Sequence, residues 1–158
     1  MQEEVWIDAG THPVAVLLMG IPAGGKSSFY RRYLEPRGLV HINLDTLRTR
    51  YREQHLLREC LCGGQSFAVD NTNTLREERA VYIRAAREAG YSVQGFFFRS
   101  CVAECLQRNE LRENAVPRSA VLAMSARLQL PSLSEGFDSL FYVRLGPEGF
   151  EVSPWREE

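Results

Sequence analysis

The sequence predicts an α/β protein, a three-layer domain around a mostly parallel five-stranded sheet. Short apolar runs, each typical of a strand buried on both faces, alternate along the chain with longer amphipathic segments of helical period. This alternation indicates right-handed strand–helix–strand crossovers, which put helices on both faces of a parallel sheet. The 158 residues fit one domain, 1–158, in which we expect residues 1–12 and 147–158 to be peripheral terminal segments.

The first half of the chain supplies three strands and two helices. Residues 14–18 are uniformly apolar, and the apolar spacing after them marks a helix that begins near Lys26 and stops before a Pro and a Gly. Residues 39–43 are the second strand. Leucines and a tyrosine among many arginines indicate a helix over 46–61, which a Gly-Gly pair ends, and 67–69 resumes the sheet.

The second half completes the pattern. Apolar positions three to four residues apart mark a helix around 81–89, which ends at a glycine, and 91–98 is the fourth strand. Helical patterns follow over 101–111 and 118–130. The apolar segment 140–145 closes the predicted sheet.

Composition limits the classes of function. The longest apolar run, 14–19, is far shorter than the ~20 residues of a membrane span, so we expect no membrane partner. The acidic N-terminus lacks the layout of a secretory signal, which makes the cytoplasm the expected compartment. Because the net charge is −1, a nucleic-acid partner would require a local basic patch.

The strongest motif lies between the first strand and the first helix. The segment GIPAGGKS satisfies GxxxxGKS in the strand-to-helix context that this motif requires. Small residues let backbone amides surround phosphate oxygens, and the helix N-terminus adds partial positive charge. Lys26 is expected to bridge the β and γ phosphates of ATP, and Ser27 to supply an oxygen ligand for Mg²⁺. The predicted nucleotide-binding residues are Gly20, Ile21, Pro22, Ala23, Gly24, Gly25, Lys26, Ser27 and Ser28.

Asp45 follows the second strand, at the sheet edge where the carboxyl ends of parallel strands meet. If it points into a cleft there, it can take a proton from an attacking hydroxyl group. Arg48, three residues later, would share a helical face with Asp45 and hold an acceptor phosphate or the transferred group. The alternative is that Asp45 only caps the following helix, and the spacing does not decide between the two.

Asp70 ends the third strand, as does the acid that holds magnesium or its water in P-loop enzymes. Asn71, Thr72 and Asn73 after it alternatively form a simple polar turn. We expect Asp70 to be a metal ligand together with Ser27.

Two arginines lie four residues apart in the polar stretch before Pro117. Arg108 and Arg112 would suit a mobile helical lid that places a guanidinium over the phosphates. Their alternative role is surface solvation. Between Arg31 and Arg58, seven arginines face three acidic residues, an excess that suits a phosphate backbone but is also common on exposed helices.

Five segments together resemble a known enzyme family: GIPAGGKSSF, HINLDTLR, VDNTNTLREERAVYIRAAREAG, LQRNELRENAVP and SEGFDSLFYVRL. They are similar to the 5′-hydroxyl kinase domain of polynucleotide kinase/phosphatases, which are AAA-like P-loop kinases. The resemblance covers about residues 14–145 and implies an adenylate-kinase-like P-loop kinase fold with a helical lid. It also implies ATP and Mg²⁺ as cofactors and the 5′-hydroxyl end of DNA or RNA as the acceptor.

The resemblance assigns roles to four residues. In the family, the residue matching Asp45 activates the acceptor hydroxyl, and the one matching Arg48 binds the acceptor phosphate. Arg112 matches a lid residue that contacts the γ phosphate, and Arg108 lies where a neighbouring lid arginine approaches the nucleotide.

Three features depart from the family pattern. Ala23 stands where the loop usually has Gly, and its methyl group disfavours a positive φ. Leu44 replaces an Arg that often precedes the catalytic Asp, which removes a possible substrate contact. The 158 residues hold no phosphatase or ligase module, so we expect a free-standing kinase or one that works with separate proteins. The competing hypotheses are a kinase for a small molecule (nucleoside, metabolite, antibiotic or tRNA-linked amino acid) and an ATPase switch.

Overall fold

A computed structural model describes residues 12–157. They form one six-stranded sheet of strand order β2-β3-β1-β4-β5-β6, in which only the β5–β6 pairing is antiparallel. The strands are β1 (Val14–Met19), β2 (Val40–Ile42), β3 (Phe67–Asp70), β4 (Ser92–Phe98), β5 (Ser139–Gly146) and β6 (Gly149–Pro154). The predicted α/β fold with a mostly parallel sheet is thereby confirmed, with six strands in place of five.

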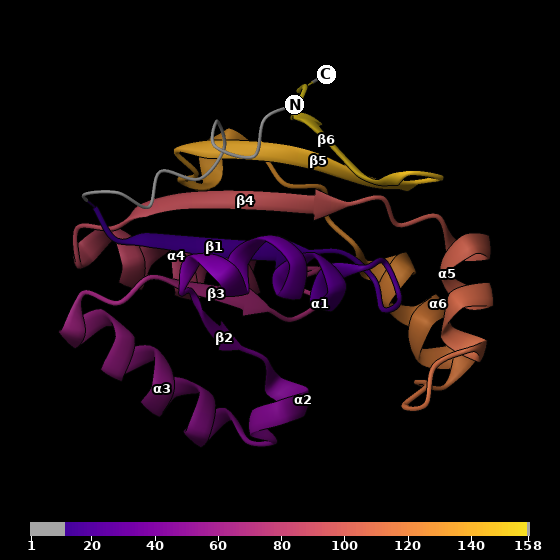
Figure 1. Ribbon diagram of the computed structural model, residues 1–158, viewed down its shortest axis with the longest axis horizontal. Coiled ribbons are helices and arrows are strands. Elements are labelled where there is room, and N and C mark those ends of the chain that lie inside the picture. Colours follow the sequence, from indigo (N-terminus) through magenta and orange to yellow (C-terminus); the bar gives the residue numbers. More distant parts are fainter. Residues whose placement is uncertain (1–11, 158) are drawn as a thin grey trace.

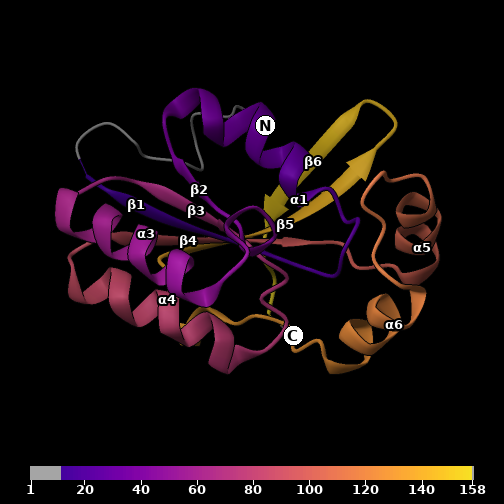
Figure 2. The ribbon, with the colours of Figure 1, turned by 90° about the horizontal axis from the view of Figure 1, so that it is seen from below.

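Helices cover both faces of the sheet and one of its ends (Figures 1 and 2). One face carries α1, and the other carries α3 and α4, while α5 and α6 stand beyond the carboxyl ends of the parallel strands. The helices are α1 (Lys26–Phe29), α2 (Leu44–Leu47), α3 (Arg50–Gly63), α4 (Arg76–Glu88), α5 (Val102–Glu110) and α6 (Arg118–Arg127), with short turns η2 (Tyr30–Leu34), η3 (Glu35–Arg37) and η4 (Leu133–Glu135). No helix among the described residues is long and apolar enough to cross a membrane.

The central strand β1 explains the two hydrophobic cores. All six of its residues are buried, and side chains alternate between the faces. Ala15, Leu17 and Met19 enter the core under α3 and α4, whereas the side chains between them enter the core under α1. This central position leaves the glycine-rich loop after β1 in the middle of the carboxyl edge.

The sixth strand lies in the segment expected to be peripheral. Residues 149–154 pair with β5 through a tight turn at Gly146 and Gly149. Phe150 and Val152 pack against the core under α1, which explains why the segment joins the sheet. Residues 1–11 of the other expected peripheral segment lie outside the described part of the chain.

The predicted helix over 46–61 is interrupted. Arg48 adopts a left-handed conformation with φ 73°, which ends α2 after four residues, and the Thr49 side chain then caps the start of α3. The predicted single helix from Lys26 is also divided, because its α-helical turn passes into the wider turn η2 and then into η3.

Candidate active site

The glycine-rich loop connects β1 to α1 and is tied to neighbouring strand ends. The Gly20 amide donates to Thr72 O (2.9 Å), and the Ile21 amide donates to Ser100 Oγ (3.2 Å). Gly25 has a φ of 98°, and a Cβ there would lie 3.0 Å from the Phe150 ring of β6. Ala23 has a φ of 66°, so the loop keeps a left-handed turn at this position despite the methyl group.

Lys26 is buried at the start of α1. Its Nζ donates to Gly20 O (2.8 Å) and Ile21 O (2.9 Å) inside the loop. Burial lowers the pKa of Lys26 to about 8, although the negative charge of Asp70 opposes this shift. Arg112 and Asp45 act on the same ammonium group, the first lowering and the second raising its pKa. Arg112, after α5, and Asp45, on α2, therefore both lie within electrostatic reach of Lys26.

Asp70 and Ser27 face each other across the loop. Ser27 Oγ donates to Asp70 Oδ2 (2.6 Å), and His41 Nε2 lies 2.8 Å from the same oxygen. Burial alone would raise the pKa of Asp70, but the hydrogen bonds from His41 and Ser27 and the charge of Lys26 outweigh it, and the pKa is lowered. Asp70 is therefore a carboxylate at neutral pH, although it is only 3% exposed.

No role for His41 is predicted from the sequence. This residue belongs to β2 and stacks on Tyr30 with ring centroids 4.1 Å apart. Its contact with Asp70 depends on the parallel pairing of β2 with β3, in which His41 lies opposite Ala68. Spacing along the chain contains no sign of this contact, because the two residues are 29 positions apart.

Asp45 lies exposed on α2, and its capping role is excluded. The cap of α2 is Asn43, whose Oδ1 accepts from the Thr46 amide (3.1 Å) and whose Nδ2 donates to Asp70 O (2.7 Å). The expectation that Arg48 shares a helical face with Asp45 is wrong, because the chain leaves the helix at Arg48.

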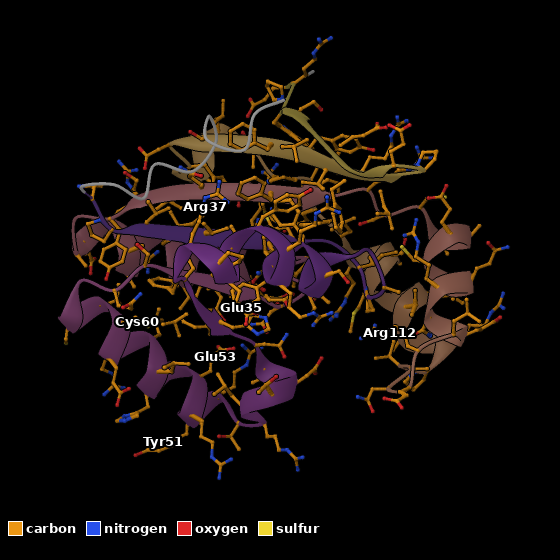
Figure 3. All side chains as sticks on the ribbon, viewed as in Figure 1. Glu35, Arg37, Tyr51, Glu53, Cys60 and Arg112 are labelled. Atoms are coloured by element: carbon orange, nitrogen blue, oxygen red, sulfur yellow. The ribbon has the colours of Figure 1, made fainter. Side chains whose placement is uncertain are left out.

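Helices α5 and α6 stand on the side of the glycine-rich loop that is opposite to α2. Their small core contains Cys105 and Val121 together with Ile21 of the loop itself. Arg108 Nη1 donates to Ala23 O (3.3 Å), while Arg112 follows the end of α5 and faces the same space (Figure 3). The two arginines thus come from α5 and the turn after it, and not from one continuous helical face.

These groups line one cleft of about 650 Å³ at the carboxyl edge of the sheet. The described residues that line it do not include Arg48. They do include Arg31, which the sequence analysis counted only within the general arginine excess. The lining is formed by Pro22, Ala23, Gly25, Lys26, Ser27, Ser28, Arg31, Asn43, Asp45, Asp70, Asn71, Thr72, Arg108, Arg112, Val116, Met124, Leu145 and Phe150.

Comparison with known proteins places the chain in a family. The family model described as AAA domain matches residues 51–131, just over half of the chain. The chain belongs to the AAA domain family. The matched range of this AAA domain protein includes Asp70 and both lid arginines and begins after the glycine-rich loop.

Two curated relatives match most of this AAA domain protein. The bifunctional polynucleotide phosphatase/kinase of Schizosaccharomyces pombe is 27% identical over 134 residues, 82% of this chain and 33% of the relative. A protein of Acanthamoeba polyphaga mimivirus, provisionally described in the same words, is 29% identical over 133 residues, 79% of this chain and 32% of its own. The chain therefore spans about a third of the length of each relative.

Solved structures share the fold at low identity. A gluconokinase from Sinorhizobium meliloti 1021 has a TM-score of 0.62 at 17% identity, covering 84% of this chain and 83% of that one. Chaetomium thermophilum Kti12 in complex with ADP-AlF3 has a TM-score of 0.64 at 19% identity, covering 82% and 88%. The AAA domain protein thus shares its fold with these two proteins.

Proposed function

We propose that the protein transfers the γ-phosphoryl group of ATP to the 5′-hydroxyl end of DNA or RNA. The observation that carries this proposal is the convergence of Lys26, Asp45 and Arg112 on one cleft. Support also comes from the two relatives named polynucleotide phosphatase/kinase, which match about four fifths of the chain.

The donor side of the cleft suits ATP. The loop amides and the cationic Lys26 offer donors to phosphate oxygens, and the Kti12 neighbour was solved with the nucleotide analogue ADP-AlF3. On phosphate binding, Lys26 would exchange the carbonyl oxygens of Gly20 and Ile21 for oxygens of the β and γ phosphates. Arg108, already at the loop carbonyl of Ala23, would approach the nucleotide from the lid.

The residues present fit a magnesium ion. Ser27 Oγ and Asp70 Oδ2 are hard oxygen donors that already lie 2.6 Å apart. Within residues 12–157 no group of three or more His, Cys, Asp or Glu side chains could hold a metal. The two oxygen donors of Ser27 and Asp70 suit Mg²⁺, which usually takes one or two protein ligands and completes its shell with phosphates and water. When bound, the ion would neutralise charge on the phosphates during transfer.

On the acceptor side, Asp45 would accept the proton of the attacking hydroxyl group. The bond from the acceptor oxygen to the γ phosphorus forms as the bond from that phosphorus to the β–γ bridging oxygen breaks, and ADP leaves. Arg112 would stabilise the charge that develops on the transferred group. Arg48 is exposed and is not among the described residues that line the cleft, so we propose that it holds a phosphate of the acceptor strand outside the cleft.

The test is transfer of label from γ-labelled ATP with Mg²⁺ to 5′-hydroxyl DNA and RNA oligonucleotides. Asp45→Asn is the matched control, because the amide keeps the shape of the side chain but cannot accept the proton. We expect labelled ends with the wild type, a loss of at least a hundredfold in the variant, and unchanged ATP binding in both. An Asn variant that transfers at the wild-type rate refutes the base assignment.

The second candidate is a kinase with a small-molecule acceptor. It is favoured by Leu44, which stands where the resembling family often has Arg, and by the gluconokinase among the structures of similar fold. Salt separates the two candidates, because binding of an oligonucleotide weakens steeply as salt rises, whereas binding of a small neutral acceptor does not. Rapid ATP hydrolysis without any acceptor would instead support an ATPase switch.

A further inference from the structure

A buried carboxylate outside the cleft has no part in the proposed chemistry. Glu53 points from α3 toward the sheet and is 3% exposed, whereas Tyr51, two residues earlier, points into solvent and is 80% exposed (Figure 3). Glu53 Oε1 accepts from the Tyr82 hydroxyl (2.6 Å) and from Arg50 Nη1 (3.0 Å). Its Oε2 accepts from Asn71 Nδ2 (2.9 Å). Burial of a charged side chain costs free energy unless the charge is paired and hydrogen-bonded, and these three donors meet that requirement for Glu53.

The carboxylate determines which way the Asn71 amide faces. Asn71 carries both donors and an acceptor at the end of its side chain, whereas a carboxylate only accepts. Asn71 Nδ2 therefore has to face Glu53, and Asn71 Oδ1 is turned to the Leu44 amide, which donates to it (2.9 Å). Burial and then the Glu53 carboxylate raise the pKa of Tyr82, so its hydroxyl keeps the proton that it donates.

The Leu44 amide belongs to the first residue of α2, which is also the residue before Asp45. A helix of four residues has little stability of its own, because nucleation costs more than its few hydrogen bonds return. Side chains from the neighbouring strand ends hold it instead. Asn43 ties one side of its start to β3, and Asn71 holds the Leu44 amide on the other.

We infer that Glu53 is a positioning residue that acts through Asn71 to fix the short helix carrying Asp45. Glu53 lies away from the cleft, since it is not among the described residues that line it. Its effect on transfer rests on the proposed function, in which Asp45 is the base. A displacement of about 1 Å at a reacting group costs roughly a hundredfold in rate, so a small shift of α2 is sufficient to matter.

The variant Glu53→Gln tests this chain of contacts. The new amide nitrogen will take the Oε2 side, because the Oε1 side already receives two donors, one of them the Arg50 guanidinium. It then faces the Asn71 amino group, donor against donor. To avoid this contact, Asn71 has to flip or withdraw, and either movement deprives the Leu44 amide of its acceptor.

Tyr82→Phe is the matched control. It removes a hydroxyl that also accepts a longer hydrogen bond from Asn71 Nδ2 (3.3 Å), but it leaves the shorter bond from Asn71 Nδ2 to the Glu53 carboxylate (2.9 Å) in place. We expect Glu53→Gln to lower kcat for phosphoryl transfer roughly tenfold to a hundredfold, with the Kd for ATP within twofold of the wild type. Exchange of the Leu44 amide hydrogen, followed by NMR, should become at least tenfold faster. Tyr82→Phe should stay within threefold in both measurements, even with an equal loss of thermal stability.

The outcomes separate this inference from the proposed function. If Glu53→Gln and Tyr82→Phe have the same kcat and the same Leu44 exchange, Glu53 is only a structural residue and the inference is overturned. Faster Leu44 exchange without loss of kcat overturns its link to transfer. If the wild type transfers to no acceptor, the proposed function fails, while Leu44 exchange still decides whether Glu53 fixes α2.

Discussion

Arg79 offers the sharpest test of how the cleft is supported. It lies on α4 and is fully buried, and its guanidinium donates twice to Glu135, through Nε to Oε1 (2.8 Å) and Nη2 to Oε2 (3.1 Å). Its Nη1 also donates to Asn73 O (2.9 Å) and Gln129 O (3.0 Å). One side chain therefore joins the turn after β3 to the segment that leaves the α5–α6 pair.

The effect of Arg79→Met follows from these contacts. Methionine fills most of the volume, so the main loss is electrostatic. It leaves the Glu135 carboxylate, whose side chain is 10% exposed, without its cation and two carbonyl groups without a donor. Removal of one partner from a buried ion pair costs about 3–5 kcal/mol. At about 2–4 °C per kcal/mol for a chain of this size, Tm should fall by roughly 10 °C.

The matched control is Arg87→Met on the same helix. Arg87 also pairs with an acid, Asp138 at 3.4 Å, but the two side chains are 51% and 47% exposed. Exposed pairs contribute less than about 1 kcal/mol, so Tm should change by no more than about 3 °C. Thermal and urea unfolding of both variants measure the difference. Equal losses in the two variants, or a loss under about 1 kcal/mol for Arg79→Met, would refute the assignment of Arg79 as a buried clamp.

Three further predictions concern the loop and the thiols. Ala23→Gly removes a Cβ in the left-handed region that costs about 1–2 kcal/mol, but it also gives the unfolded chain more freedom. The free energy of unfolding in urea should therefore rise by up to about 1 kcal/mol, and a decrease would contradict the strain at φ 66°. Phe150→Ala should destabilise the fold by about 2 kcal/mol and weaken ATP binding several-fold in a nucleotide titration, because the half-buried ring packs beside Gly25. Unchanged ATP affinity would show that β6 does not support the loop. Burial raises the pKa of the thiols of Cys60 and Cys105, whereas Cys62 is exposed. Mass mapping with a thiol reagent at pH 8 should therefore find Cys62 labelled long before Cys60 or Cys105, and equal labelling rates would contradict the burial of these two thiols.

Much of the fold follows from periodicity in the sequence, because a buried parallel strand and an amphipathic helix each have a local pattern. The parallel pairing among β1 to β5 also follows, because strands that alternate with helices are joined by crossover connections. Two features of the fold, the turn at Arg48 and the sixth strand, could not be predicted from the sequence, for physical reasons. Arginine has no local preference for a left-handed turn, so the φ of 73° at Arg48 could not be predicted from the residue type. The strand at 149–154 is too polar to stand out until Phe150 is seen against the core.

The site divides in the same way. The glycine-rich loop and Asp70 could be placed from sequence, because a motif and a strand end fix their position at the carboxyl edge. The contacts of Asp70 with His41, and of Glu53 with Asn71, could not be foreseen, because they join residues 29 and 18 positions apart. Such contacts are decided by strand order and helix packing. The catalytic and binding roles assigned to the cleft residues remain predictions until the transfer assay is made.

The two sides of the cleft also differ in how firmly the fold constrains them. The side that we propose for the donor is built on β1, whose six residues are all buried, so the loop that follows has little freedom to vary. The side that we propose for the acceptor is a four-residue helix held by asparagine side chains, which ends at a strained Arg48. We expect a change at Leu44 or Glu53 to act first on this side, because both residues form hydrogen bonds with Asn71. On the proposed function, the acceptor is therefore the less constrained of the two substrates, which is why it has to be determined by experiment on this chain.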